Sequence, residues 1–284
     1  MTSAFARKKI REMLVEDLGS GDVTSDALIQ PKTKAIAEVV AKQAGILAGV
    51  AEATIAFNEM GVKVKTVKSD GAKIKAGDVV MHLEGPARKI LAAERVALNL
   101  LMRMSGIATA TRELINRARR RNPNVTIAAT RKTAPLLTYF DKRAVVAAGG
   151  EPHRYRLSDQ ILIKDNHLRL VSSVAEAVRH VRKTARTAKI EVEVTKPEEV
   201  LDAAKAGADI VMLDNMVPAE IVRAIEMLKQ EGLRSKVVLE ASGKIEPSNV
   251  GSFAATGVDI ISSGYMTMRG PALDMSLEIK KAKS

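Results

Sequence analysis

The sequence contains no cysteine and no tryptophan, and aromatic residues make up only 2% of its 284 positions. Without cysteine the chain forms no disulfides, no iron–sulfur clusters and no Cys-ligated zinc sites. With so few aromatic side chains, a surface that stacks single-stranded bases cannot be built. No apolar run approaches the roughly 20 residues that a membrane-spanning helix needs. These absences exclude several classes of redox, nucleic-acid-binding and membrane protein.

What the sequence does contain is typical of a globular protein. Hydrophobic residues make up 46% and charged residues 27%, which is enough apolar material for a sizeable core. At about 150 residues per domain, the length predicts one large domain or two ordinary ones. The start of the chain, MTSAFARKKIREML, is charged and amphipathic and lacks the apolar segment of a signal peptide. We therefore predict a cytoplasmic protein without membrane association.

The chain carries a clear excess of positive charge. Lys and Arg number 45 against 33 Asp and Glu, which gives a formal net charge of +12. Such an excess favours anionic partners, which are either nucleic acid or a small anionic substrate. The basic residues are scattered, and the one dense cluster lies at a predicted helix end, at Arg117, Arg119, Arg120 and Arg121. We interpret most of the excess as solvated surface and expect no nucleic-acid partner.

The pattern before about residue 105 is that of a mixed α+β unit. Helical periodicity covers residues 7–18, 45–59 and 88–104, and strand-like runs cover 35–42 and 62–67. Two turns around short strands are indicated between residues 69 and 78. We predict that this first domain spans residues 1–108.

From about residue 110, short apolar runs alternate with helical segments, as in a parallel sheet. The runs lie at 125–129, 160–163, 190–192, 210–213, 237–239 and 258–261, and the helical segments at 171–187, 197–206, 218–232 and 247–256. No G-x-G-x-x-G motif follows any of these strands, so a dinucleotide-binding sheet is disfavoured. The pattern predicts an incomplete α/β barrel of about six strands over residues 109–272.

Polar side chains occur at the end of every predicted barrel strand. In chain order they are Arg131 and Lys132, Lys164, Glu191 and Glu193, Asp214, Glu240, Ser242 and Gly243, and Ser263 and Gly264. A stiff Gly-Gly-Glu-Pro loop precedes His153 and Arg154, and it would hold both near Arg131. Because the active site of a βα barrel lies at the carboxyl ends of its strands, we expect a shared site there. Structural ion pairs are the alternative, although buried charge pairs at best break even energetically.

The residue types at this rim indicate their chemistry. The Arg and Lys side chains suit a highly anionic ligand, and Glu193 with Asp214 is typical of a pair that holds Mg²⁺ partly through water. The Ser-Gly pairs after the last two strands favour a phosphate-bearing substrate. The four histidines have no metal-ligand spacing, so a catalytic transition-metal site is not expected.

Several motifs together resemble the quinolinate phosphoribosyltransferase family. They include ATRKT at residues 129–133 and LIKDNH at 162–167, with further matches at 16–24, 94–99, 105–109, 149–154, 157–159, 190–194, 212–216, 240–243 and 257–264. The resemblance implies an N-terminal α/β-sandwich domain, joined by the C-terminal tail at 273–284, on an incomplete α/β barrel. It also implies a homodimer or a higher assembly of dimers.

The resemblance implies a reaction as well. Quinolinate and phosphoribosyl pyrophosphate (PRPP), with Mg²⁺ as cofactor, give nicotinate mononucleotide, pyrophosphate and CO₂ in NAD biosynthesis. It assigns quinolinate binding to Arg95, Arg131, His153, Arg154 and Lys164, where Arg95 reaches the neighbouring subunit's site. It assigns the PRPP phosphates to Lys132, Ser242, Gly243, Ser263 and Gly264. Catalytic roles fall to Lys132, Lys164, Glu193 and Asp214, and the last two would also be the Mg²⁺ ligands.

Three positions depart from the family pattern. Thr138 stands where members often have arginine, Met268 where many have histidine, and Glu151 where glycine is common. Arg269, beside Met268, is a candidate replacement for that histidine. A same-fold enzyme that acts on a different base, such as the paralogue found with molybdate-transport genes, is the alternative. The intact Lys-Asp-Asn-His run at residues 164–167 favours quinolinate.

Overall fold

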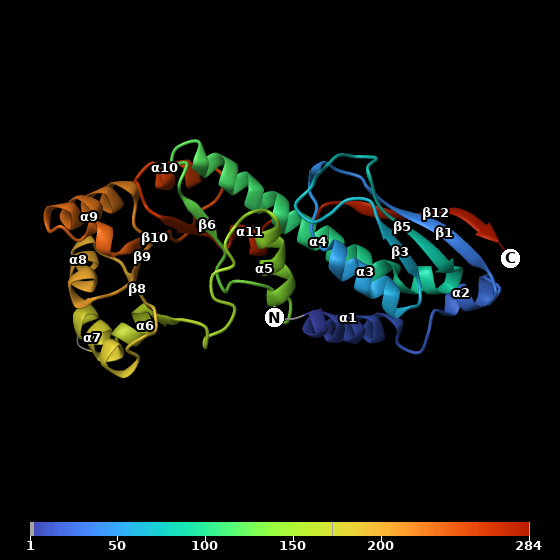
Figure 1. The fold of residues 1–284 in the computed structure, drawn as a ribbon, viewed down its shortest axis with the longest axis horizontal. Helices are drawn as coiled ribbons and strands as arrows, with labels where there is room; N and C mark the ends of the chain where they lie inside the picture. Colours follow the sequence, from blue (N-terminus) through green and yellow to red (C-terminus); the bar gives the residue numbers. More distant parts are fainter. Residues whose placement is uncertain (1–2, 172, 284) are drawn as a thin grey trace. The chain divides into compact units, whose positions relative to one another are not determined.

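The computed structural model describes residues 3–171 and 173–283, and the chain divides into two compact units (Figure 1). Unit 1 comprises Met1–Ala110, Ala134–Gly149 and Gly270–Ser284, and unit 2 comprises Thr111–Thr133 and Gly150–Arg269. Two predicted segments include a residue that the structure does not describe: Ser172 in the predicted helix 171–187, and Ser284 in the predicted tail 273–284. The domain limits 1–108 and 109–272 stay a prediction.

Unit 1 is built on a four-stranded antiparallel sheet in the order β12-β1-β5-β3. The strands are β1 (Lys34–Ala41), β3 (Lys63–Thr66), β5 (Val79–Pro86) and β12 (Met275–Lys283). A two-stranded sheet, β2 (Gly45–Ile46) with β4 (Lys73–Ile74), lies in the same unit. Along β1, side chains alternate between exposed and buried at its start, and Ala37 and Val39 are fully buried. This alternation is what a strand with one covered face requires.

The C-terminal strand β12 pairs with β1 over its whole length, with Val39 opposite Leu277. The segment before β12 passes close to α4 (Ala87–Arg119) at Gly106. A Cβ atom at Gly106 would lie 2.1 Å from the carbonyl oxygen of Pro271, so only glycine fits there. The end of the chain is therefore an integral part of the first unit's sheet.

The helices of unit 1 differ in part from their predicted limits. They are α1 (Ser3–Leu18), α2 (Val23–Leu28), α3 (Val50–Glu59), the part of α4 up to Ala110, and α5 (Thr138–Ala147). The predicted helix 45–59 begins too early, because Gly49 adopts a left-handed conformation (φ 95°) and residues 45–46 form β2. The helix predicted at 88–104 continues to Arg119, and α5 was not predicted.

Unit 2 contains a six-stranded, fully parallel sheet in the order β6-β11-β10-β9-β8-β7. Its strands are β6 (Thr126–Ala128), β7 (Ile161–Ile163), β8 (Ile190–Val194), β9 (Ile210–Asp214), β10 (Val238–Ser242) and β11 (Ile260–Ser262). Within the described residues the edge strands β6 and β7 do not pair with each other, so the barrel is open. The predicted mixed α/β fold with an incomplete, six-stranded barrel is confirmed.

Helices α7 (Val174–Thr184), α8 (Pro197–Ala206) and α9 (Pro218–Gln230) cover the outer side of this sheet (Figure 1). Two of them share a start signal: α8 and α9 begin with proline and carry a glutamate at the third helical position. The Glu199 carboxylate accepts the Lys196 N–H at 3.2 Å, and Glu220 accepts the Val217 N–H at 2.9 Å. These caps start each helix soon after its strand and so define the rim of the barrel.

Short helices complete unit 2: α6 (Asp165–Leu168), a 3₁₀ turn η1 (Arg234–Lys236), α10 (Val250–Ala254) and α11 (Tyr265–Met268). Both α6 and α11 follow a strand directly, after β7 and β11. Among the described residues, no helix has the length and apolar character needed to cross a bilayer.

Candidate functional site

A cavity of about 580 Å³, here called the central cavity, opens at the carboxyl ends of the unit 2 strands. It brings together residues from the ends of all six strands of the sheet and from the loop before β7. The predicted site residues in its wall are Arg131, Lys132, His153, Arg154, Lys164, Glu193, Asp214, Ser242 and Gly243. Residues that are distant in sequence therefore meet at one place, as the alternating βα pattern indicates.

A second cavity of about 670 Å³, here called the Ser-Gly cavity, adjoins the central cavity. The two share wall residues, among them Lys132, Ser242 and Gly243. The Ser-Gly cavity adds Ser263 and Gly264, together with Met268 and Arg269. Two lysines, Lys132 and Lys244, line both cavities.

The acidic side of the central cavity lies on β8 and β9. Glu193 is opposite Met212 in the strand register, so Glu193 and Asp214 project from the same face of the sheet. The Glu193 carboxylate contacts Lys164 Nζ at 2.5 Å, and Asp214 Oδ2 accepts a hydrogen bond from the Asn215 amide at 2.7 Å. Hard carboxylate oxygens on adjacent strands are the donor set that Mg²⁺ takes in proteins. The residues present therefore fit such an ion.

The cationic side contains two arginines near each other. Arg131 follows β6. Arg154 lies in a segment that runs parallel to β6 at Glu151, where the Glu151 N–H donates to the Ile127 carbonyl at 2.8 Å. Burial and the nearby positive charge of Arg131 lower the pKa of Arg154. Two guanidinium groups that repel each other in a partly buried wall favour a ligand with negative charge.

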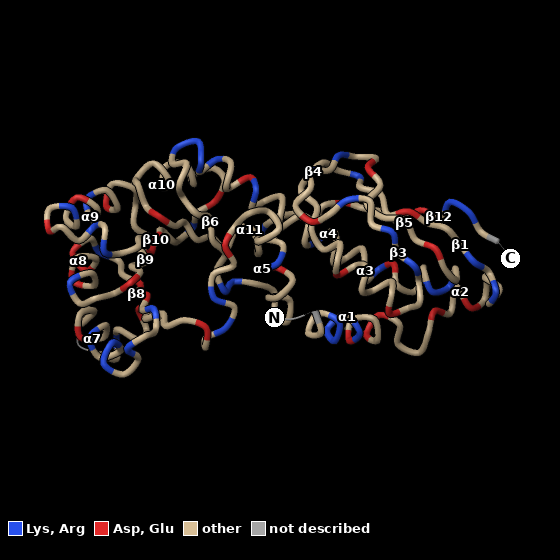
Figure 2. The backbone as a smooth tube through the Cα atoms, viewed as in Figure 1, with Lys and Arg blue, Asp and Glu red and all other residues tan. Residues whose placement is uncertain are grey.

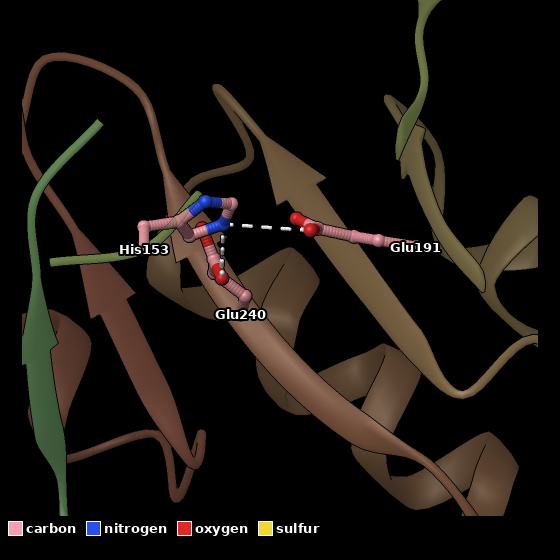
Figure 3. Close-up of side chains that lie close together, drawn as sticks. All are labelled: His153, Glu191 and Glu240. Carbon is pink, nitrogen blue, oxygen red and sulfur yellow. Dashed lines mark ion pairs between the residues drawn. The ribbon is translucent and has the colours of Figure 1, made fainter. Parts of the chain in front are cut away.

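His153 connects this segment to two buried acids, Glu191 and Glu240 (Figure 3). Its Nε2 atom lies 3.4 Å from Glu191 Oε2 and 3.5 Å from Glu240 Oε2. Its Nδ1 atom accepts the main-chain N–H of Arg154 at 2.8 Å. Burial lowers the pKa of His153, but its contacts with the two carboxylates outweigh this and raise the pKa to about 9.

The hydrogen bond from Arg154 and the attraction of the two carboxylates have opposite effects on the protonation of His153 Nδ1. The hydrogen bond from Arg154 needs an unprotonated Nδ1, whereas the carboxylates favour a second proton on the ring. Nε2 carries a proton in either state, and this proton faces the two acids. The pKa of Glu191 is raised mainly by its burial and further by the nearby charge of Glu240, while the contact with His153 lowers it.

Lys132 is held in place through its main chain. Its N–H donates to Thr130 Oγ1 at 3.0 Å, and its carbonyl oxygen accepts the Thr267 hydroxyl at 2.6 Å. Gly264 packs against its side chain, because a Cβ there would lie 3.1 Å from Lys132 Cδ. Lys132 is thus held in place by the segment that follows β6 and by α11.

The Ser-Gly loops differ in what they offer to a ligand. Gly243 has φ 105°, and a Cβ there would lie 2.5 Å from Asn215 Oδ1, so the position requires glycine. Ser263 uses its donors within the protein: its hydroxyl donates to the Ile245 carbonyl at 2.5 Å and its N–H to the Ala128 carbonyl at 3.0 Å. Ser263 therefore shapes the wall of the Ser-Gly cavity.

Arg95, a predicted site residue, lines neither cavity, and two glutamates near the central cavity received no role in the prediction. Arg95 is an exposed residue of α4 in unit 1 and does not line either cavity. Glu240 lines the central cavity and Glu191 supports it; the sequence placed both on the barrel rim but assigned neither a binding or catalytic role. The signal was present in the spacing: Glu191 and Glu240 lie two residues before Glu193 and Ser242, so each shares their face of the sheet.

Outside the site, Lys and Arg are spread along both units and alternate with acidic residues (Figure 2). Several of them form exposed ion pairs, such as Lys229 with Glu226 at 2.8 Å and Arg223 with Glu198.

Comparison with known proteins identifies both parts of the chain. The profile of the "Quinolinate phosphoribosyl transferase, N-terminal domain" matches residues 22–105, and the profile of the C-terminal domain of the same family matches residues 107–278. A Methanothermobacter thermautotrophicus protein named "Probable nicotinate-nucleotide pyrophosphorylase", carboxylating, is 46% identical over 96% of this chain and 99% of its own length. The human carboxylating nicotinate-nucleotide pyrophosphorylase is 37% identical over 89% of this chain and 85% of its own length.

Solved structures show the same similarity. NadC from Streptococcus pyogenes superposes with a TM-score of 0.92 and 34% identity, covering 100% of this chain and 98% of that one. The nicotinate-nucleotide pyrophosphorylase from Francisella tularensis superposes with a TM-score of 0.90 and 34% identity, covering 99% and 98%.

Proposed function

Because the chain belongs to the quinolinate phosphoribosyltransferase family, we propose that its central cavity is where quinolinate receives the phosphoribosyl group. The enzyme transfers this group from PRPP to quinolinate with decarboxylation and yields nicotinate mononucleotide, pyrophosphate and CO₂. This reaction is a step of NAD biosynthesis. The observation that best supports the central cavity as its site is the close approach of Arg131 and Arg154 beside Lys132 and Lys164.

Quinolinate is a dianion, and the cationic wall suits its two carboxylates. Arg131 and Arg154 each offer a planar guanidinium that can grip a carboxylate with two hydrogen bonds. Their mutual repulsion falls when the dianion enters, so binding relieves an unfavourable interaction of the free protein. We assign His153 and Lys164 to the same ligand, which these groups orient with its ring nitrogen toward the sugar.

PRPP takes the acidic side and the Ser-Gly cavity. Ser242, Gly243 and Gly264 accommodate the 5′-phosphate, since the absence of a Cβ at both glycines lets main chain approach it closely. Lys132, which lines both cavities, neutralises phosphate oxygens, and Glu193 with Asp214 would hold Mg²⁺ and the ribose. When bound, Mg²⁺ supplies positive charge that stabilises the departing pyrophosphate.

The bond-forming step needs no general base. The lone pair of the quinolinate ring nitrogen forms the new bond to the anomeric carbon, while the bond from that carbon to pyrophosphate breaks and its electrons leave with the pyrophosphate. The ring nitrogen becomes cationic and draws electrons from the adjacent carboxylate, which departs as CO₂. A proton from solvent then replaces it on the ring carbon. The cations of the wall act by stabilising charge rather than by moving protons.

The activity is tested directly with the purified protein, quinolinate, PRPP and Mg²⁺. We expect pyrophosphate and nicotinate mononucleotide to appear in equal amounts and to depend on all three additions. Nicotinate in place of quinolinate is the matched control and is expected to give no product, because it lacks one carboxylate. Product from another base and none from quinolinate would instead support the paralogue with a different acceptor.

A homodimer, or a higher assembly of dimers, completes the site in this proposal through Arg95 of the neighbouring subunit. The support is that Arg95 is exposed on α4 and lines neither cavity of its own chain. Mixing inactive Arg95→Ala with inactive Asp214→Asn is expected to restore part of the activity in hybrid dimers. No rescue, with hybrids verified by mass spectrometry, would mean that Arg95 does not serve the neighbouring site. The cytoplasmic location stays a prediction.

A further inference from the structure

Two buried acids behind the central cavity have fewer partners than their burial demands. Glu191 and Glu240 are both 0% exposed. Among the described residues, Glu191 Oε1 and both carboxylate oxygens of Glu240 accept no hydrogen bond. An unsatisfied buried carboxylate oxygen is costly, and replacement of such acids by apolar residues often stabilises a protein. Packing alone therefore gives no reason for these two residues.

Among the described residues, the side-chain hydrogen bond and ion pairs of the two acids lead to the same segment of the wall. Both face Nε2 of His153, at 3.4 and 3.5 Å (Figure 3). Glu191 Oε2 also accepts the side-chain amide of Gln160 at 2.9 Å, and the Gln160 carbonyl in turn accepts Arg154 Nη1 at 3.2 Å. The main-chain N–H of Arg154 donates to Nδ1 of His153. The acids thus support His153 directly and Arg154 through two different routes.

A metal ion is the competing explanation for one histidine and two glutamates whose ligand atoms lie within 4.8 Å of one another. The hydrogen bonds disfavour it. Since Nδ1 accepts the Arg154 N–H, a neutral ring carries its proton on Nε2, which then has no lone pair for a metal. The nearby Arg154 also adds positive charge where a cation would bind. Ion pairs between the ring at Nε2 and the two carboxylates account for the geometry without a metal ion.

We propose that Glu240 and Glu191 are positioning residues of the quinolinate side of the site, which hold His153 by Nε2 and, together with Gln160, set the place of Arg154. The acids do not touch the substrate in this proposal. His153 adopts a left-handed backbone conformation (φ 52°), which a non-glycine residue keeps only where its surroundings fix it. The two carboxylates provide that fixation from the interior of the barrel.

This proposal rests on the proposed function, so the experiment compares each variant with an active wild-type enzyme. Glu240→Gln keeps the size of the side chain and removes its charge. We expect it to raise KM for quinolinate about tenfold while KM for PRPP changes less than about twofold, since a misplaced charged contact costs roughly that factor. Glu240→Asp, which keeps the charge, should recover part of the loss.

The decisive measurement is a double-mutant cycle with His153. In a His153→Asn background, Glu240→Gln should have no further effect on KM for quinolinate, because the residue it positions is already gone. Glu52→Gln is the matched control: Glu52 is another buried glutamate, 1% exposed, paired with Arg143 in unit 1. It should lower the melting temperature without changing the ratio of the two KM values.

Several results would overturn the proposal. A folded Glu240→Gln enzyme with wild-type KM for quinolinate would do so, as would an effect that adds in full to that of His153→Asn. One equivalent of a transition metal in the wild type that is lost from Glu240→Gln would replace it with a metal site. If Glu240→Gln does not fold, Glu191→Gln is subject to the same criteria. A wild-type protein without quinolinate activity would instead refute the proposed function. In that case calorimetric titration would still compare the affinities of the wild type and the variants for quinolinate.

Discussion

Asp141 of unit 1 and the pair Glu191 and Glu240 of unit 2 are all buried acids, but their oxygens are satisfied in different ways. In unit 1, Asp141 is 0% exposed and Arg103 binds both of its oxygens, at 2.7 and 2.8 Å. The Ala134 N–H adds a third hydrogen bond at 3.3 Å. In unit 2, Glu191 and Glu240 share a single histidine and keep three oxygens without a hydrogen bond among the described residues.

The difference shows that burial of a charge does not by itself indicate its role. An acid whose oxygens are bound by a partly exposed arginine contributes to stability, because the pair needs no ligand to be complete. Acids that leave oxygens unsatisfied next to a cavity indicate a site whose arrangement matters more than its stability. The partners of a buried acid, rather than its depth, separate the two cases.

The largest expected effect is on an acid at the rim of unit 2. Asp214→Asn should lower kcat/KM for PRPP about a hundredfold or more, because it removes a negative charge from the proposed Mg²⁺ and ribose contact. Its melting temperature should stay close to that of the wild type, since Asp214 is only half-buried. Initial rates over a PRPP series, with calorimetric melting as control, give both values. An enzyme that keeps wild-type kinetics would exclude Asp214 from the site.

A smaller effect is expected when one of the two crowded arginines is removed. Arg131→Ala should raise KM for quinolinate about ten- to a hundredfold, the usual range for a lost charged hydrogen bond, with little change in KM for PRPP. Arg119→Ala, at the end of α4, is a control that removes an arginine outside both cavities. If KM for PRPP rises as much as KM for quinolinate, the division of the cavity into two sides is wrong.

In unit 1 the expected effect is on stability alone. Asp141→Asn removes the carboxylate charge that Arg103 binds and should lower the free energy of unfolding by about 2 kcal/mol, less than for a fully buried pair because the Arg103 side chain is 32% exposed. The two KM values should remain within about twofold of the wild type. Urea denaturation and steady-state kinetics provide the test. A selective rise in one KM would contradict the contrast between the units.

The smallest effect concerns pH. Burial lowers the pKa of His153, but Glu191 and Glu240 raise it overall from 6.5 to about 9 in the folded protein. Since the folded pKa exceeds the unfolded one, the stabilisation is complete below about pH 6.5 and is lost as the pH rises to about 9. The wild type should therefore exceed His153→Asn in free energy of unfolding most near pH 6. A difference that stays constant up to about pH 9.5 would argue against this.

Much of the site could be predicted from sequence because parallel strands place their ends together. Lys164, Glu193, Asp214 and Ser242 each end an apolar run, and the βα rhythm alone brings them to one rim. Glu191 and Glu240 were placed on the barrel strands but were given no role, because a glutamate inside a strand is ordinarily solvent-exposed. The strand register, with Glu240 and Glu193 both opposite Met212, confirms the shared face that the two-residue spacing indicates.

The fold of unit 1 shows where local patterns were insufficient. The early start of the helix predicted at 45–59 was wrong because a single residue, Gly49, takes a conformation that ends one element and begins another. The tail could be placed on the first domain only through the family resemblance. Its pairing with β1 joins residues more than 230 positions apart, for example Val39 and Leu277, and no local pattern encodes a contact of that range.

The return of β12 to β1 has a consequence for how the protein is made. During synthesis the N-terminal segment leaves the ribosome first, yet one edge of its sheet has no partner until residues 275–283 emerge. Until those residues are synthesised, β1 presents an open row of N–H and C=O groups to any other extended chain nearby. Because β12 covers this side of β1, a nascent chain that stalls before residue 275 is exposed to misassembly.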